Sequence, residues 1–323
     1  MKFFCILSGI LLAAAALVLL TAWICFRMAF FVTPEQKAQA QESCVPEGEI
    51  YEPFRDCMTA WTMEARSIAH QEFTVRSFDG LTLHGNYYEC TPGAPIELMF
   101  HGYRGAAERD LSGGVQRCFA LGRNALIVDQ RASGRSGGNI ITFGVNESRD
   151  CLSWLELMIQ VFGPDVQIIL CGISMGAATV LMAAGRPLPE NVVGVLADCG
   201  YTSPRDIIQK TIREMKLPPK LAYPFVKLGA RIFGHFDLEE LPPLEAMKQC
   251  TVPVIFFHGD TDDFVPCWMS QRNFEACTAR KKLVIVPGAG HGLSYLIDQE
   301  LYLRELADFF PEYTSTAVYT TVS

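Results

Sequence analysis

The first hydrophobic feature of the chain is an uncharged stretch from Phe3 to Phe26, in which Ser8 and Thr21 are the only clearly polar side chains. About 20 helical residues suffice to cross the hydrocarbon layer of a bilayer, so this stretch predicts a membrane-spanning helix. A cleaved signal peptide usually has only about 7–15 apolar residues, followed by small residues at the cleavage site. The residues around Trp23 are bulky instead, which favours an uncleaved anchor over residues 1–32.

A polar segment and then a helix are predicted after the anchor. Residues 33–48 have the composition of a juxtamembrane linker. Between residues 51 and 69, apolar side chains recur at helical spacing, at Phe54, Met58, Trp61 and Ala65. We therefore expect residues 33–70 to be a linker followed by a helix that packs one face on the body of the protein.

The period of the hydrophobic pattern changes at about residue 71. Two strands joined by a tight turn at Asp79-Gly80 are predicted first. Strand-length apolar runs then alternate with helical stretches, at Ile96–Phe100, Ala125–Val128, Gln167–Cys171, Val192–Leu196, Pro253–Phe257 and Lys282–Val286. This alternation predicts an α/β fold over residues 71–312, with a mostly parallel eight-stranded sheet and helices on both faces.

One insertion and one tail depart from this alternation. Residues 202–250 contain no predicted strand, but they contain two helical stretches, at 203–215 and 219–233. The insertion is too short to be a second domain, and we expect it to cover the site as a lid does. The tail, 313–323, is rich in Thr and Ser and is predicted to be flexible.

Composition and charge narrow the class of protein. Half of the 323 residues are hydrophobic, which excludes a disordered chain. The 27 basic and 35 acidic residues give a net charge of −8, so nucleic-acid binding is not expected. The twelve cysteines form no C-x-x-C pair, and several lie in apolar runs, which indicates packing in a reducing environment. The metal motif H-E-x-x-H and the phosphate-binding P-loop motif are also missing from the sequence, so we expect no metal or other cofactor.

A candidate nucleophile follows the strand that ends at Cys171. The segment Gly172-Ile173-Ser174-Met175-Gly176 has the pattern G-x-S-x-G and opens a predicted helix. On such a sharp strand-to-helix turn, a serine projects its hydroxyl into the cleft at the carboxyl ends of the strands. The pattern alone is common by chance, but a strand before it and a helix after it single out Ser174.

Two backbone amides are candidates for binding the oxygen that becomes negative during acyl transfer. The loop His101-Gly102-Tyr103-Arg104-Gly105 follows a buried strand, and its glycines let the Tyr103 amide turn towards that oxygen. The Met175 amide lies at a helix N-terminus, one residue beyond Ser174, and would be the second donor. The phenol of Tyr103 is a further donor to consider, although the amide is preferred.

A serine hydroxyl needs a base to take its proton and an acid to fix the tautomer of that base. His291 is the candidate base because it lies in a glycine-rich turn between the last strand and the last helix. The acid comes from Asp260, Asp262 or Asp263, and spacing favours Asp262, with Asp263 second. His101 and His258 are expected to be buried and hydrogen-bonded instead.

Taken together, these segments resemble the α/β-hydrolase family, and in particular the branch of monoglyceride lipases, feruloyl-type esterases and serine aminopeptidases. The resemblance covers roughly residues 73–310. The family pattern G-x-x-D-x-x-V-P is present from Gly259 to Pro266 with Asp262 at the acid position, and the oxyanion pattern H-G-x-x-G is present at 101–105. A third family pattern, D-x-R-G-x-G-x-S, matches residues 129–136, except that Ala132 replaces the first glycine. Arg131 in that segment is expected to be a structural ion-pair partner.

Together with the predicted anchor, the resemblance implies a membrane-anchored serine hydrolase that cleaves carboxylic esters of small molecules through an acyl-enzyme and needs no cofactor. A peptidase or thioesterase with the same triad is the alternative. A non-catalytic protein that binds a lipid or a protein partner is the rival from another class. Lys2 on one side of the anchor and Arg27 and Lys37 on the other nearly balance, so the side of the membrane stays open, as does the oligomeric state.

Overall fold

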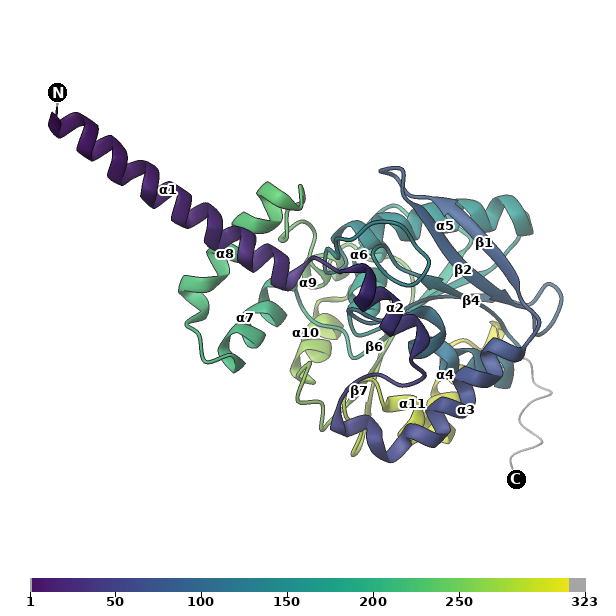
Figure 1. Cartoon of the computed structure of the whole chain (residues 1–323). Helices are drawn as coiled ribbons and strands as arrows, with labels where there is room; N and C mark the ends of the chain where they lie inside the picture. Colours follow the sequence, from purple (N-terminus) through teal and green to yellow (C-terminus); the bar gives the residue numbers. More distant parts are fainter. Residues whose placement is uncertain (1, 314–323) are drawn as a thin grey trace.

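A computed structural model of the chain describes residues 2–313 (Figure 1). Eight strands form one sheet in the order β1-β2-β4-β3-β5-β6-β7-β8. β2 is antiparallel to both its neighbours, β1 and β4, and the other neighbouring strands are parallel. The predicted α/β fold is therefore confirmed. The strands are β1 (Gln71–Arg76), β2 (Thr82–Tyr88), β3 (Ile96–Phe100), β4 (Asn124–Asp129), β5 (Ile168–Ile173), β6 (Val192–Asp198), β7 (Val254–Gly259) and β8 (Lys281–Val286).

Each face of the sheet is covered by its own layer of helices. Side chains alternate along a buried strand, so Leu98 of β3 packs in one core and Met99 in the other. One core is completed by α5 (Val145–Phe162), α6 (Met175–Ala184), α9 (Pro243–Met247) and α10 (Trp268–Ala276). The other is completed by α4 (Ala107–Ala120), α11 (Ser294–Ile297) and α12 (Gln299–Phe309), after which the turn η2 (Pro311–Tyr313) follows.

The N-terminal helix α1 (Lys2–Ala29) projects from the body of the molecule (Figure 1). Its most apolar stretch of 18 residues has a mean hydropathy of 2.8, and none of these residues is buried. The helix is long and apolar enough to cross a membrane, a test that a signal sequence also passes. Ala22 and Phe26 in its last turns, and Phe30 directly after it, are buried against the body.

The segment predicted as a polar linker contains the helix α2 (Pro34–Glu42). Thr33 starts this helix, because its side chain accepts the amide of Gln36 while its own amide donates to the Gln36 side chain. The turn η1 (Glu49–Phe54) and the helix α3 (Arg55–Ser67) follow. α3 packs on α4, where the Trp61 ring lies over Gly113 so closely that a Cβ there would come within 2.9 Å of it.

The insertion forms the helices α7 (Pro204–Glu214) and α8 (Pro219–Phe233), followed by α9. α8 packs against the last turns of α1, and the two rings of Phe26 and Phe233 lie 5.8 Å apart. Gly229 makes the approach feasible, because a Cβ at that position would lie 2.4 Å from the Ala22 carbonyl oxygen. The tail beyond Tyr313 lies outside the described residues, so its predicted flexibility stays a prediction.

A buried carboxylate joins β3 to two arginines. Glu97 accepts hydrogen bonds from Arg117 of α4 and, at 2.7 Å, from Arg123 before β4. Burial alone would raise the pKa of Glu97, but the two guanidinium groups outweigh it and lower the pKa to about 2. The ion cluster is therefore charged throughout the neutral range.

Replacing Glu97 with glutamine should destabilise the fold by about 3–5 kcal/mol at pH 7, because it leaves two buried cations without their anion. A depressed folded-state pKa contributes stability above the unfolded pKa, near 4.5, which is lost as the pH falls towards 2. Urea unfolding should therefore show the deficit of the variant shrinking between pH 5 and pH 2. The exposed Glu156→Gln serves as the control, and a deficit independent of pH would contradict this account.

Candidate active site

Ser174 occupies the turn between β5 and α6, with φ 58° and ψ −116°. Residues other than glycine rarely adopt a positive φ, and such strain is held only where the surrounding structure imposes it. Here the Ser174 amide donates to the Asp198 carbonyl at 2.9 Å, and the Ser174 carbonyl accepts from the Ala178 amide in the first turn of α6. The turn thereby presents the side chain at the carboxyl edge of the sheet.

Contacts explain the two glycines of the G-x-S-x-G segment. A Cβ at Gly172 would lie 2.1 Å from the Gly176 carbonyl oxygen, and a Cβ at Gly176 would lie 1.9 Å from the Phe100 carbonyl oxygen. No side chain fits at either position unless the backbone moves. The two glycines are therefore required because the turn packs closely on itself and on β3.

His291 lies between Ser174 and Asp262. Its Nε2 is 2.8 Å from Ser174 Oγ, and its Nδ1 is 2.7 Å from Asp262 Oδ2. An ionised carboxylate only accepts hydrogen bonds, so Nδ1 carries the ring proton and Nε2 is left to accept the proton of the serine hydroxyl. The three side chains come from the loops after β5, β7 and β8, at one edge of the sheet.

Asp262 is held by backbone as well as by histidines. Its Oδ1 accepts the amides of Phe264 at 2.9 Å and Val265 at 2.8 Å, and its Oδ2 lies 3.3 Å from His258 Nε2. Burial alone would raise the pKa of Asp262, but hydrogen bonds from His258 and His291 hold it well below its usual range. The carboxylate is therefore a fixed anion.

The other two aspartates of this segment, and His258, make contacts of their own. Asp263 is exposed, and Asp260 accepts the Gly288 amide at 2.7 Å. His258 is buried between Ser270 Oγ and the Val265 carbonyl, both 2.7 Å away, as the sequence predicted for a hydrogen-bonded core histidine. The spacing argument that preferred Asp262 to Asp263 thus agrees with the geometry.

The loop after β3 lies beside Ser174. A Cβ on Gly102 would come within 3.6 Å of Ser174 Cβ. Within residues 2–313, the amides of Tyr103 and Met175 donate no backbone hydrogen bond. Both are thus available to a ligand at this edge of the sheet.

The side chains of this loop hold the end of α1. The phenol of Tyr103 donates to the Ala29 carbonyl at 2.9 Å, so it does not serve as the additional donor considered from the sequence. The Arg104 guanidinium donates to the carbonyls of Met28 at 2.9 Å and Phe31 at 3.3 Å. Arg104 itself has φ 53°, a second strained residue of the site.

A cleft of about 610 Å³ opens over Ser174 and His291. One wall contains Ser174 and His291. The other wall comes from the segment after the anchor and includes Gln36, Gln39, Glu47, Ile50 and Tyr51. No described residue of the 202–250 insertion lines this cleft, so the expected roof is built by α2 and η1 instead. Tyr51 also donates to the His291 carbonyl at 3.2 Å, a contact that no sequence motif predicted.

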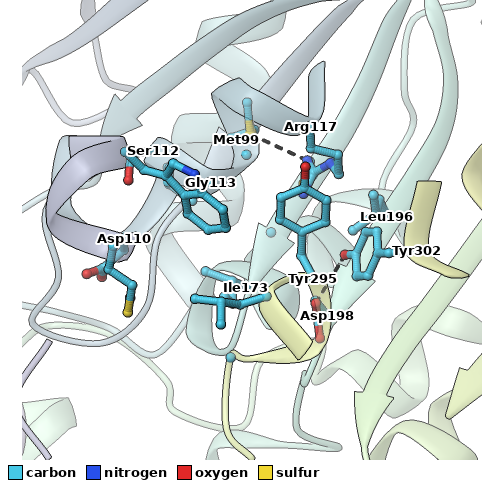
Figure 2. Close-up of a pocket in the computed structure, with 18 of the residues that line it drawn as sticks. Met99, Asp110, Ser112, Gly113, Arg117, Ile173, Leu196, Asp198, Tyr295 and Tyr302 are labelled. Atoms are coloured by element: carbon cyan, nitrogen blue, oxygen red, sulfur yellow. Dashed lines mark hydrogen bonds between the residues drawn. The ribbon is translucent and has the colours of Figure 1, made fainter. Parts of the chain in front are cut away.

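A smaller cavity of about 70 Å³ lies next to the cleft (Figure 2). The two share residues of both walls, among them Ile173, Asp110 and Gly292. Apolar groups dominate the lining of the small cavity, but Asp198 at the end of β6 is buried there and accepts hydrogen bonds from Ser294 and Tyr302. Burial raises the pKa of Asp198. This cavity provides room for one small apolar group.

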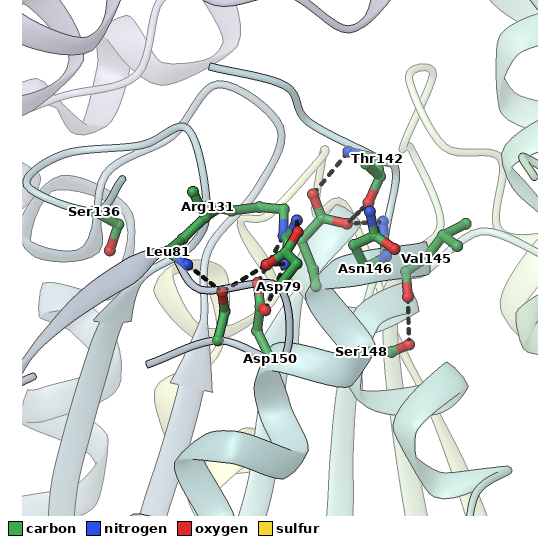
Figure 3. Close-up of polar contacts among 12 residues, drawn as sticks. Asp79, Leu81, Arg131, Ser136, Thr142, Val145, Asn146, Ser148 and Asp150 are labelled. Atoms are coloured by element: carbon green, nitrogen blue, oxygen red, sulfur yellow. Dashed lines mark hydrogen bonds and ion pairs between the residues drawn. The ribbon is translucent and has the colours of Figure 1, made fainter. Parts of the chain in front are cut away.

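Arg131 forms the ion pairs that the sequence predicted (Figure 3). Its guanidinium contacts Asp79 at 2.9 Å and Asp150 at 2.6 Å, which fastens the loop after β4 to the β1–β2 turn and to α5. In the same loop, Ala132 has φ 61°, the left-handed conformation that glycine adopts more easily. The replacement of the family glycine therefore leaves a strained alanine in an otherwise well-bonded loop.

Cys199 completes a group of three side chains that could ligate a metal ion. Its sulfur lies within 4.8 Å of ligand atoms of Asp262 and His291. Burial raises the pKa of the Cys199 thiol well above its usual value, and Asp262 and His291 are already bonded to each other. A protonated thiol packed beside this hydrogen-bonded pair fits the arrangement better than a metal ligand does.

Comparison with known proteins agrees with this geometry. Residues 98–305 match the family model described as "Alpha/beta hydrolase family". The chain belongs to the alpha/beta hydrolase family. The resemblance predicted from the sequence motifs is thereby confirmed.

Relatives of this alpha/beta hydrolase include the uncharacterized protein YqkD of Bacillus subtilis, 28% identical over 58% of this chain and 62% of that protein. Protein bem46 of Schizosaccharomyces pombe is 24% identical over 87% of this chain and 88% of that one. Among solved structures, the esterase Pf2001 of Pyrococcus furiosus has a TM-score of 0.63 and 21% identity, covering 79% of this chain and 95% of that one. Est1E of Butyrivibrio proteoclasticus, with ferulic acid bound, has a TM-score of 0.58 and 20% identity, covering 75% and 98%. These likenesses show the fold.

Proposed function

We propose that this alpha/beta hydrolase is a membrane-anchored serine hydrolase that cleaves carboxylic esters. The observation that carries the proposal is the hydrogen-bonded series Ser174 Oγ, His291 and Asp262, with distances of 2.8 and 2.7 Å. Such a series converts a weak nucleophile into a reactive one.

In the proposed mechanism, Ser174 Oγ attacks the carbonyl carbon of the ester while its proton passes to His291 Nε2. Asp262 holds the resulting imidazolium through Nδ1. The amides of Tyr103 and Met175 donate to the oxyanion. The tetrahedral intermediate then expels the alcohol, which takes the proton from Nε2. Water repeats the sequence on the acyl-enzyme, giving up a proton to His291 and releasing the carboxylic acid and the Ser174 hydroxyl.

Two features favour a small ester with a short acyl group. The cavity of about 70 Å³ beside the cleft admits a small apolar group, whereas the larger cleft, lined by apolar residues together with polar ones such as Gln36, Gln39 and Glu47, has room for the alcohol part. Esterases are among the proteins of similar fold, and so is an acylaminoacyl peptidase of Pyrococcus horikoshii, of which the match covers 43%. Cleavage of a peptide bond by the same triad is therefore the second candidate function.

The anchor proposal rests on α1. We propose residues 1–32 as an uncleaved anchor, 33–70 as the connection and 71–312 as the catalytic domain. The contacts of Phe26 and Phe30 in a core shared with α8 support retention of the helix, since a signal sequence that is removed would leave this core open.

The proposal is tested with the full chain in detergent micelles. p-Nitrophenyl esters of increasing acyl length and the matching p-nitroanilides are assayed side by side, and a fluorophosphonate probe is used to label the nucleophile. We expect ester turnover with an optimum at short acyl groups, and labelling located at Ser174 by peptide mass. Turnover of anilides alone would replace esterase by peptidase, and a folded protein that reacts with neither substrate nor probe would leave the binding-protein alternative.

A further inference from the structure

The α7–α8 region carries an unusual concentration of positive charge. Residues 207–236 contain six basic side chains and one acidic one, a net charge of +5 in a chain whose total is −8. The remainder of the chain therefore carries −13. A basic region on so acidic a protein is expected to meet a partner of negative charge.

Four of these cations have no bonded partner in the described part of the chain. Lys210 pairs with Glu214 and Lys227 pairs with Glu239, which leaves the side chains of Arg213, Lys216, Lys220 and Arg231 without a hydrogen bond or ion pair among residues 2–313. All four are exposed. Their charge is thus available to something outside the molecule.

Exposed apolar side chains alternate with these cations. Met215, Leu217 and Leu221 are 50%, 48% and 69% exposed, and Ile232 at the far end of α8 is 39% exposed. The two kinds of side chain share the α7–α8 connection and the outer face of α8. A mixed basic and apolar helix surface of this kind is typical of helices that lie in the headgroup region of a bilayer.

The position of α8 supports the same partner. α8 is fastened to the last turns of α1 by the contacts of Gly229 with Ala22 and of Phe233 with Phe26 (Figure 1). The part of α1 before these contacts is apolar, and its most apolar stretch has no buried residue. If α1 spans the membrane as proposed above, α8 is held where the helix leaves the hydrocarbon, at the level of the lipid headgroups.

We propose that the surface formed by Arg213, Met215, Lys216, Leu217, Lys220, Leu221, Arg231 and Ile232 binds anionic lipid headgroups beside the anchor. The apolar side chains enter the boundary between headgroups and acyl chains, and the four cations contact lipid phosphates or carboxylates. This inference rests on the proposed anchor. It gives the catalytic domain a second attachment that fixes its tilt on the membrane, which a single helix does not.

The test uses the full chain in nanodiscs of phosphatidylcholine, with and without phosphatidylserine. A photoreactive p-benzoylphenylalanine replaces Leu221 or, as a matched control, Val161, an exposed apolar residue at the C-terminal end of α5, the end opposite to Val145, which packs with Phe26 and Phe30. We expect lipid adducts at position 221 to exceed those at position 161 by about tenfold and to increase further when phosphatidylserine is present. Lys216→Glu combined with Lys220→Glu should remove the increase that depends on phosphatidylserine.

Equal adduct yields at positions 221 and 161 would overturn the proposal. An adduct yield at position 221 that changes neither with phosphatidylserine nor with the two Lys→Glu substitutions would also overturn it. Placing the probe at Leu217 repeats the measurement with a second variant. Resistance to alkaline carbonate extraction from membranes is measured on the same proteins. A retained chain with equal yields would contradict the lipid surface alone, whereas an extracted chain would contradict the anchor and the lipid surface together. Ester turnover on the same nanodiscs reports on the triad separately.

Discussion

Replacing Ser174 with alanine is expected to lower kcat/KM for a p-nitrophenyl ester by at least about 10⁴-fold, because it removes the hydroxyl that is hydrogen-bonded to His291 Nε2. The measurement is steady-state hydrolysis by the purified full chain, together with fluorophosphonate labelling, which should vanish. Ser153→Ala, in α5, is the control for a serine outside the site and should keep parental turnover.

The backbone of Ser174 gives this prediction a second readout. Because φ is 58°, glycine fits the turn with less strain than alanine does, so Ser174→Gly should be more stable than Ser174→Ala by about 1 kcal/mol in urea unfolding. Both variants lack Oγ and should be equally inactive. An alanine variant that unfolds like the parent but keeps its turnover would assign the nucleophile to another residue.

Replacing Asp262 with asparagine should lower kcat by about 10³- to 10⁴-fold, with a smaller change in KM. An amide at this position can donate to His291 Nδ1, which favours the tautomer with the proton on Nε2 and so removes the acceptor for the serine hydroxyl. The effect is measured by the same assay on the same ester.

The adjacent aspartates provide matched controls for this loss. Asp263→Asn should leave turnover near the parental value, since its side chain is exposed and lies outside the triad. In Asp260→Asn, we expect any change to be in the stability of the loop that Asp260 holds through the Gly288 amide, with turnover near the parental value. A large loss in Asp263→Asn with parental activity in Asp262→Asn would reverse the assignment of the acid.

Much of the fold and of the candidate site could be predicted from local patterns. The buried strands gave apolar runs of strand length, and the candidate residues Ser174, Asp262 and His291 each follow such a run within a short motif. Carboxyl ends of parallel strands meet at one edge, so the motifs also predicted that the three residues would be neighbours. The glycines flanking Ser174 are explained by contacts within a few residues and with the adjacent strand.

The walls of the cleft could not be predicted in the same way. Tyr51 donates to the His291 carbonyl, and α2 lines the same cleft as Ser174, although these segments lie far apart in the sequence and share no pattern. The insertion was expected to cover the site because it interrupts the strand–helix alternation with two helical stretches and is too short to be a second domain. Instead, the apolar face of α8 packs on α1, where Gly229 permits a close approach. Hydrophobicity alone does not specify which surface a helix will cover.

The three hydrogen bonds from Tyr103 and Arg104 to the end of α1 have a practical consequence. Membrane enzymes are commonly simplified by deleting the hydrophobic helix to obtain a soluble protein. In this molecule, a cut before Thr33 would strip two side chains of the loop beside Ser174 of the carbonyls they bind, and would open the aromatic core around Phe143 and Phe236. The N-terminal helix is therefore part of the structure that holds the loop beside Ser174, and a chain shortened before Thr33 would lack that support.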